Sequence, residues 1–132
     1  MEKQSTAGFW LSPQQKHVWL WQQQKPQNSV CVVRWEGPLR ESALRAAIEK
    51  IVSRHEILRT VFVRQPGMKV PFQVIQEKLE PAWESVDLKG LNPEQQSERL
   101  DRIFVAEQGR VFNLESGPML QITLAQDRKS VV

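Results

Sequence analysis

The spacing of apolar positions changes its period along the chain, and each period predicts a different element. One long amphipathic helix is predicted by a stripe of residues at helical spacing, and a sheet or another helix must cover this stripe. The stripe consists of Leu44, Ala47, Ile48, Ile51, Val52 and His55. From Leu58 the period becomes two as far as Val63, and it is two again over residues 70–76. The turn-forming residues 65–68 between these runs predict a β-hairpin. Because Pro71 has no N–H to donate, we expect its strand to lie at an edge or to carry a bulge.

Two more helices are predicted from their N-terminal signals. Ser12 is a typical N-cap, the proline after it suits the first helical position, and Gln15 completes a capping box. This helix should stop before Pro26. Residues 92–95, Asn-Pro-Glu-Gln, give the same signal for a helix that ends near Gly109.

β-branched and alternating runs predict the remaining strands. These are residues 30–35, 83–88 and 119–126, with Cys31 expected to be a small buried apolar residue of the first. Residues 127–129 have the composition of a turn, and residues 130–132 that of the start of another strand.

The element order is α β α β β β α β, followed by the start of a strand. This order predicts an α+β fold, a layered α/β sandwich with a mixed sheet that contains an antiparallel hairpin. A strand start with nothing after it to pair with contributes little stability. We therefore expect residues 1–132 to be the N-terminal part of something longer, incomplete at the C-terminus.

Composition and charge narrow the function classes. The 132 residues carry 18 Lys+Arg and 15 Asp+Glu, a net charge of +3 that is too small and too scattered to indicate nucleic-acid binding. No apolar run reaches the roughly 18 residues that span a membrane, and no signal peptide is present, so we expect a cytoplasmic protein without a membrane partner.

The single cysteine excludes an internal disulfide and a cysteine-rich zinc site. No metal site, phosphate-binding glycine loop or nucleotide fingerprint is found, so we expect no cofactor in this chain.

The stretch RHEILRTVF, residues 54–62, holds the most prominent candidate site residues, Arg54, His55 and Arg59. His55 continues the apolar stripe of the long helix and should face inward, where its ring nitrogens need partners. An arginine presents five donors in a planar fork, which suits it to tie loop carbonyls together. We therefore favour a structural support at the helix–strand junction. Direct contact with a substrate remains the alternative.

The same stretch carries a resemblance to a known family. It matches RHExLRTxF, the second core motif of nonribosomal peptide synthetase condensation domains, at every specified position. The first core motif, S-x-A-Q-x-R-(L/M)-W-x-L, is matched within residues 12–21 at Ser12, Gln15 and Trp19, and it departs at positions 14, 17, 18 and 21. Residues 112–120 resemble the family's FDL-x-x-GPLLR segment. The chain thus resembles the N-terminal lobe of a condensation domain from about Phe9 to its end.

The resemblance implies a chloramphenicol acetyltransferase-like fold, in which two lobes enclose a tunnel. It implies that the intact domain joins an acyl or peptidyl donor to an aminoacyl acceptor, each tethered through phosphopantetheine to a carrier protein domain, by forming an amide. The family's catalytic motif, HHxxxDG, would follow the strand that begins near Ser130. The resemblance therefore implies no catalytic residue in this chain, which would be inactive without the missing C-terminal lobe of the same domain.

The resemblance also implies roles for the motif residues. Arg54, His55 and Arg59 would support the catalytic loop from below. Ser12, Gln15 and Trp19 either line the tunnel mouth or only pack the first helix. Two alternatives stay open for the whole chain: a stand-alone, non-catalytic binding module with the same fold, or part of an epimerisation domain.

Overall fold

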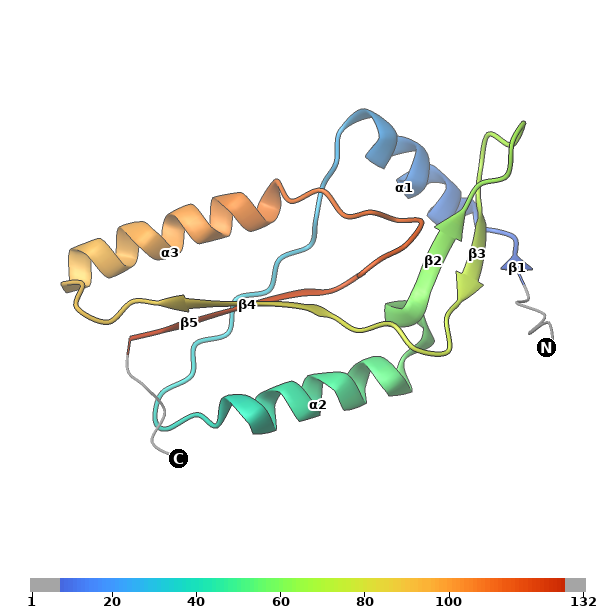
Figure 1. Cartoon of the computed structure of the whole chain (residues 1–132). Helices are drawn as coiled ribbons and strands as arrows, with labels where there is room; N and C mark the ends of the chain where they lie inside the picture. Colours follow the sequence, from blue (N-terminus) through green and yellow to red (C-terminus); the bar gives the residue numbers. More distant parts are fainter. Residues whose placement is uncertain (1–7, 128–132) are drawn as a thin grey trace.

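The computed structural model describes residues 8–127, which form three helices, a short 3₁₀ helix and five strands (Figure 1). In chain order these are β1 (Gly8–Phe9), α1 (Pro13–Gln24), α2 (Glu41–Arg54), η1 (Glu56–Arg59), β2 (Thr60–Val63), β3 (Phe72–Ile75), β4 (Ala82–Asp87), α3 (Pro93–Gln108) and β5 (Gln121–Gln126). The strands divide into a three-stranded antiparallel sheet of order β1–β3–β2 and a parallel pair, β4–β5. The expected α+β class is confirmed, although the two kinds of pairing occupy two sheets.

The predicted helix starts are confirmed by their capping contacts. Ser12 Oγ accepts a hydrogen bond from the Gln15 amide at 3.1 Å, and Gln15 Oε1 accepts one from the Ser12 amide at 2.9 Å. Asn92 and Gln95 form the same reciprocal pair at the start of α3. These contacts satisfy amides that the first helical turn leaves without partners.

The predicted hairpin is confirmed, with two corrections to its details. β2 and β3 pair antiparallel from Thr60↔Ile75 to Val63↔Phe72. The residues just before β2 form η1 and not the first part of the strand. The prediction that the strand of Pro71 is an edge strand or bulged is wrong, because β3 lies between β1 and β2. Pro71 directly precedes β3, so its missing N–H removes no ladder hydrogen bond.

Helices lie on both sides of the parallel pair (Figure 1). β4 and β5 are in register from Ala82↔Gln121 to Asp87↔Gln126, and α3 makes the crossover that a parallel pair requires. The start of α2 reaches β4, where Ser85 Oγ donates to Glu41 Oε1 at 3.0 Å. The Arg45 guanidinium lies 4.7 Å from the centre of the Trp83 ring. These contacts hold α2 beside the pair.

The segment between α1 and α2 departs from the prediction. Residues 30–35 contain neither helix nor strand, so the predicted strand is wrong. The prediction that Cys31 is buried is also wrong, because the residue is exposed. β propensity describes fit to a pleated surface, and no neighbouring strand among the described residues supplies one. The predicted turn at 127–129 and strand start at 130–132 fall largely outside the described residues, which end at Asp127.

Four of the five buried residues among the described ones gather where α2 meets the antiparallel sheet. These are Val52, Thr60, Val61 and Pro71, of which Val61 is 0% exposed, whereas Leu88 is buried just after β4. The described helices include none that is long and apolar enough to cross a membrane. The helix–strand junction around Thr60 is therefore the packing centre of the described part of the chain.

Gly117 lies against Leu79 in the approach to β5. Its φ is +72°, and an added Cβ would lie 2.9 Å from both Leu79 methyl carbons. Gly67 also has a positive φ, of +86°, but a Cβ there would meet nothing within 4 Å. Both sites need glycine for backbone reasons, and only Gly117 needs it for space as well.

We predict that Gly117→Ala destabilises the chain more than the matched control Gly67→Ala. The control measures the left-handed backbone cost alone, about 1–2 kcal/mol. Gly117→Ala adds the overlap with Leu79, and Leu79→Ala in the same chain should recover part of the loss. Urea unfolding midpoints provide the measurement. Equal losses at the two glycines would contradict the close approach.

Candidate functional site

The RHEILRTVF stretch forms a sharp junction between α2 and the antiparallel sheet. α2 ends at Arg54, and His55 takes an extended conformation with φ −112° and ψ 103°. The single turn of η1 follows, in which the Leu58 amide donates to the His55 carbonyl at 3.0 Å. Thr60 Oγ1 then donates to the Glu56 carbonyl at 2.8 Å as β2 begins. The chain thus reverses from helix to strand within a few residues.

Arg59 ties the two sides of this junction together. Its Nε donates to the Val52 carbonyl at 3.1 Å and its Nη2 to the Ser53 carbonyl at 3.3 Å, both in the last turn of α2. Its Nη1 donates to the carbonyls of Gln76 at 2.6 Å and Glu77 at 3.4 Å, just past β3. The last carbonyls of a helix have no partner within the helix, and one guanidinium here supplies two of them.

The backbone of Arg59 takes part in the same junction. Its carbonyl accepts a hydrogen bond from the Gln76 amide at 2.7 Å, while its side chain donates to the Gln76 carbonyl. Arg59 and Gln76 are therefore linked twice, once through each peptide group of Gln76. This double link fixes how far β3 lies from the end of α2.

Arg54 and His55 differ from Arg59 in their exposure and in their contacts. Both are exposed, and within residues 8–127 neither side chain has a hydrogen bond or ion pair. The prediction that His55 faces inward is wrong, because α2 ends one residue earlier and the extended backbone of His55 takes its side chain off the apolar stripe. Of the three candidates, the structure gives bonded partners to Arg59 alone.

The residues of the first motif lie where α1 meets the antiparallel sheet. Gln15 Nε2 donates to Gln73 Oε1 at 3.0 Å, and Gln73 Nε2 lies 3.2 Å from Gln15 Oε1. Gln73 Nε2 also donates to the Trp10 carbonyl at 3.0 Å. Because Ser12 and Gln15 form the cap of α1, this amide pair fixes the start of the helix on β3. Trp19 is half-buried farther along α1.

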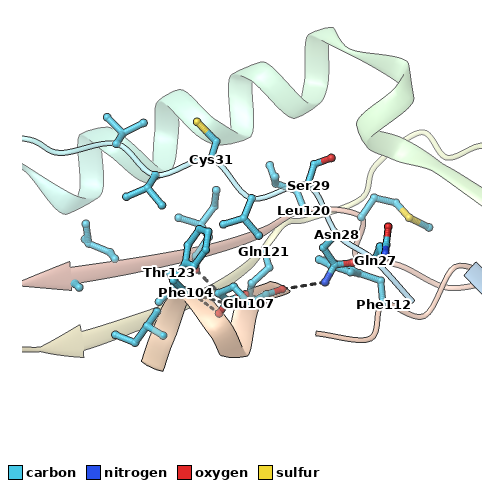
Figure 2. Close-up of a pocket in the computed structure, with 18 of the residues that line it drawn as sticks. Gln27, Asn28, Ser29, Cys31, Phe104, Glu107, Phe112, Leu120, Gln121 and Thr123 are labelled. Atoms are coloured by element: carbon cyan, nitrogen blue, oxygen red, sulfur yellow. Dashed lines mark hydrogen bonds between the residues drawn. The ribbon is translucent and has the colours of Figure 1, made fainter. Parts of the chain in front are cut away.

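A large cleft of about 2220 Å³ opens beside these elements. Gln15 and Trp19 line it from α1, together with residues 26–39, one face of α3 and residues 119–127. Figure 2 shows part of this lining, with side chains of α3, of β5 and of residues 27–31 drawn together. From RHEILRTVF the lining includes Ile57 and Phe62, but not Arg54, His55 or Arg59. The three polar candidates of that stretch therefore lie outside the lining of the cleft.

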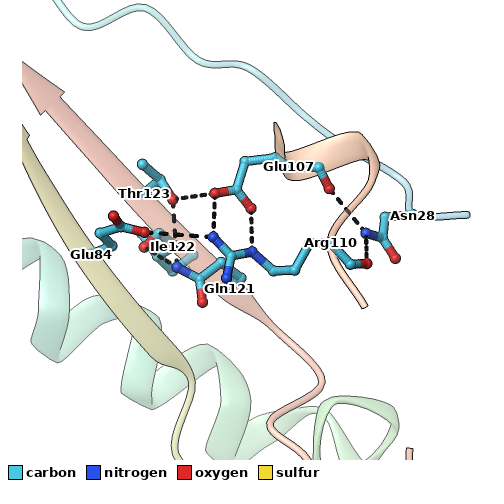
Figure 3. Close-up of polar contacts among 7 residues, drawn as sticks. All are labelled: Asn28, Glu84, Glu107, Arg110, Gln121, Ile122 and Thr123. Atoms are coloured by element: carbon cyan, nitrogen blue, oxygen red, sulfur yellow. Dashed lines mark hydrogen bonds and ion pairs between the residues drawn. The ribbon is translucent and has the colours of Figure 1, made fainter. Parts of the chain in front are cut away.

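A second polar cluster, which the sequence patterns did not reveal, joins the end of α3 to β4, β5 and Asn28 (Figure 3). Arg110 Nε and Nη2 donate to the two carboxylate oxygens of Glu107, each at 2.8 Å. Arg110 also pairs with Glu84 of β4 at 3.5 Å, and Thr123 Oγ1 of β5 donates to Glu107 at 2.9 Å. Asn28 Nδ2 donates to the backbone carbonyls of Glu107 and Arg110. We call these five residues the Arg110 cluster.

The Arg110 cluster joins four parts of the chain through ion pairs and hydrogen bonds. The bidentate bond from Arg110 lowers the pKa of Glu107, an effect that burial partly opposes and the Thr123 hydroxyl reinforces. The same carboxylate raises the pKa of Arg110. Glutamate and arginine three residues apart at the end of a helix form a common pair, so the spacing of Glu107 and Arg110 was the available sequence signal. Nothing in the sequence indicated that Asn28, Glu84 and Thr123 would join them.

Comparison with known proteins points to one protein family. The family model described as "Condensation domain" matches residues 7–132. A linear gramicidin synthase of Brevibacillus parabrevis is 34% identical over 120 residues, which cover 88% of this chain and 2% of that protein. Phosphinothricin tripeptide synthetase PhsC of Streptomyces viridochromogenes is 33% identical over 89% of this chain and 11% of its own length. The chain therefore spans a small part of the curated relatives that it matches.

Solved structures share the fold. The epimerization domain from the third module of tyrocidine synthetase B superimposes with a TM-score of 0.74 at 24% identity, over 96% of this chain and 29% of that one. The starter condensation domain of rhizomide synthetase RzmA, an R148A mutant in complex with C8-CoA, gives a TM-score of 0.72 at 20% identity, over 94% and 28%. Because both identities are below 25%, these two superpositions show a shared fold alone.

We predict that Arg59→Lys destabilises the chain by about 1–3 kcal/mol, because an ammonium cannot reach four carbonyls on two elements. Arg54→Lys is the matched control, since it makes the same change at an exposed arginine five residues away. The control should stay within about 0.5 kcal/mol of the parent chain. Urea unfolding of both variants measures the difference, and losses of the same size would show that the fork geometry of Arg59 is irrelevant.

We predict that Glu107 makes the stability of the chain depend on acid. An unfolded glutamate has a pKa of about 4.3, and the folded pKa of Glu107 is lower. Its contribution is therefore fully present above about pH 4.3 and is lost as the pH falls through the folded pKa. Urea midpoints from about pH 7 to pH 3 should fall less steeply for Glu107→Gln, which begins from a lower value at neutral pH. Parallel curves for the two chains would contradict the prediction.

Proposed function

The chain belongs to the condensation-domain family, and we propose that residues 1–132 form the N-terminal part of a domain that makes amide bonds in a nonribosomal peptide synthetase. The observation that carries this proposal is the family match over residues 7–132, which includes the whole RHEILRTVF stretch. Two curated relatives that match most of the chain are named as a linear gramicidin synthase subunit and a tripeptide synthetase. The solved domains of the same fold are more than three times as long as the part that matches, which supports a role as one part of a larger domain.

The proposed reaction joins two tethered substrates. A carrier protein domain holds each substrate as a thioester of phosphopantetheine. The acceptor amine attacks the carbonyl carbon of the donor thioester, the C–N bond forms, the C–S bond breaks and the donor thiol leaves, while the amine loses a proton. Such a reaction depends on holding both reactants in one geometry. Its proton-handling groups would come from outside this chain, whose two histidines, His17 and His55, are not adjacent to another histidine.

The residues of this chain would act by positioning. We assign Arg59 to the support of the wall that Ile57 and Phe62 present to the cleft. Arg54 and His55 lie beside it in the sequence, and among residues 8–127 their exposed side chains make no contact on which that wall depends. The four carbonyl contacts of Arg59 support this role for it. Ser12 and Gln15 would hold α1 against β3 through Gln73, and Trp19 would form part of the lining on α1. No residue of the chain is assigned to contact with the reacting atoms.

The test uses the full-length polypeptide that carries this chain, supplied with a donor carrier protein and an aminoacyl acceptor carrier. We expect a carrier-bound amide, detected by mass spectrometry of the intact carrier. Inversion of the acceptor's stereocentre without amide formation would replace the proposal by epimerisation. Carrier binding without turnover would replace it by a non-catalytic binding module.

We further predict that Arg59→Lys in this polypeptide lowers the rate of amide formation about tenfold or more, because small displacements of a supporting wall are costly for positioned reactants. Arg54→Lys should change the rate less than about twofold. Single-turnover rates at saturating carrier separate this effect from weaker carrier binding, and circular dichroism checks that both variants are folded. Equal rates for the two variants would remove Arg59 from its assigned role.

A further inference from the structure

Helix α1 has two faces of different composition. The ionisable side chains of the helix, Lys16 and His17, lie outside the lining of the cleft. The face that lines the cleft is uncharged and consists of Gln14, Gln15, Val18, Trp19, Gln22 and Gln23. Each carboxamide offers both donors and an acceptor for hydrogen bonds. This face therefore suits a neutral ligand that carries hydrogen-bonding groups of its own.

Two of these glutamines already bind partners within the chain. Gln15 pairs with Gln73 and with the Ser12 amide. Gln22 Oε1 accepts a hydrogen bond from the Gln27 amide at 3.0 Å, and Gln22 Nε2 donates to the Gln27 carbonyl. One carboxamide of this face thus binds the backbone N–H and the backbone C=O of a single residue. The same two-point contact is available to any peptide chain that reaches a free glutamine here.

Gln14 is such a glutamine. It lies on the same row of α1 as Val18 and Gln22, because helical residues four apart stand next to each other. Its side chain is exposed and lines the cleft. Within residues 8–127 it makes no hydrogen bond, in contrast to Gln15 and Gln22. The carboxamide of Gln14 is therefore open to a ligand in the cleft.

Gln14 and Val18 both depart from the first core motif, and both departures make the row less apolar. The motif has alanine in place of Gln14 and leucine or methionine in place of Val18. The first difference adds a carboxamide to the cleft wall, and the second removes apolar bulk. Val18 is 55% exposed, so packing among the described residues explains neither difference. What the two differences change is the surface that a ligand meets.

We propose that Gln14 hydrogen-bonds an amide group of the donor chain, and that it makes a peptidyl donor a better substrate than a fatty acyl donor. This inference rests on the proposed amide-forming function and names the donor class for it. The aminoacyl acceptor brings an amine and no peptide chain, so a run of amides comes from the donor. A fatty acyl chain displaces water from the Gln14 carboxamide and gives it no partner, which costs binding energy.

The phosphopantetheine arm is a second source of amide groups. It is the same for every donor on one carrier protein, so a contact between Gln14 and the arm affects all donors equally. A contact with the peptidyl chain affects peptidyl donors alone. Two donors compared on one carrier therefore distinguish the two sources.

A competition assay in the full-length polypeptide tests the inference. One portion of the donor carrier protein is loaded with N-acetyl-alanyl-alanine and another with an octanoyl group, which has the same number of main-chain atoms. Both portions compete for one aminoacyl acceptor carrier, and mass spectrometry of the products gives the ratio of the two kcat/KM values.

The variant Gln14→Met keeps the length of the side chain and removes its carboxamide. Gln24→Met is the matched control, because Gln24 is an exposed glutamine of the same helix that does not line the cleft. Methionine and glutamine have similar helix propensities, so α1 should form in both variants. Circular dichroism checks this.

We expect the parent polypeptide to favour the peptidyl donor. Gln14→Met should lower the peptidyl-to-octanoyl ratio about fivefold or more, as the loss of one hydrogen bond predicts. Gln24→Met should change the ratio less than about twofold. An unchanged ratio in Gln14→Met would overturn the inference, and equal slowing of both donors would assign Gln14 to the arm instead.

A parent polypeptide that favours the octanoyl donor would overturn the inference as well. The absence of amide from both donors would overturn the proposed function, and the inference with it. Because the other outcomes all require amide to form, failure of the donor preference and failure of the proposed function remain distinguishable.

Discussion

The guanidinium of Arg59 is the contact on which the arrangement around it depends. The last turn of a helix leaves carbonyls without partners, and the end of a strand does the same. Arg59 donates to both sets, at Val52 and Ser53 on α2 and at Gln76 and Glu77 after β3. The buried residues Val52, Thr60 and Val61 pack beside it. The angle between α2 and the antiparallel sheet follows from one planar side chain, and so does the position of the cleft wall formed by Ile57 and Phe62.

The parallel pair β4–β5 also depends on the guanidinium of an arginine, in this case Arg110. The Arg110 cluster joins the end of α3 to both strands and to Asn28, about as directly as Arg59 joins α2 to the hairpin. Apolar burial alone does not hold these elements, because neither α3 nor either strand contains a fully buried residue. The chain spans 29% of the solved domain that it matches. In this chain the guanidinium contacts of Arg59 and Arg110 fix how the helices lie on the strands, and further packing would then stabilise that arrangement. In this division of labour Arg59 ties α2 to the hairpin from outside the lining of the cleft.

Local signals in the sequence predicted most of the elements but not their partners. The capping boxes at Ser12 and Asn92 and the period-two runs around the hairpin act over a few residues, so they can be recognised without the fold. Residues 30–35 show the limit, because a strand is defined by its neighbour and the propensity of Val32 and Val33 does not supply one. The predicted burial of His55 was wrong for a similar reason. A helical stripe predicts burial only as far as the helix extends, and α2 ends at Arg54. The Arg110 cluster was missed because its members come from four separate regions of the chain. The resemblance of RHEILRTVF identified the family, whereas the contacts of Arg59 became visible only in three dimensions.

The most direct test of the central claim is amide hydrogen exchange at Gln76, followed by NMR. This amide donates to the Arg59 carbonyl at 2.7 Å, while the Gln76 carbonyl accepts from the Arg59 guanidinium, so it senses the junction itself. The Leu88 amide, which donates to Gln126 in the parallel pair, is an internal reference far from the junction. If Arg59 fixes the junction, Arg59→Lys should speed exchange at Gln76 about tenfold or more and leave Leu88 nearly unchanged, a difference of about 1.4 kcal/mol in local opening. Unchanged exchange at Gln76, or equal acceleration at both amides, would contradict the account.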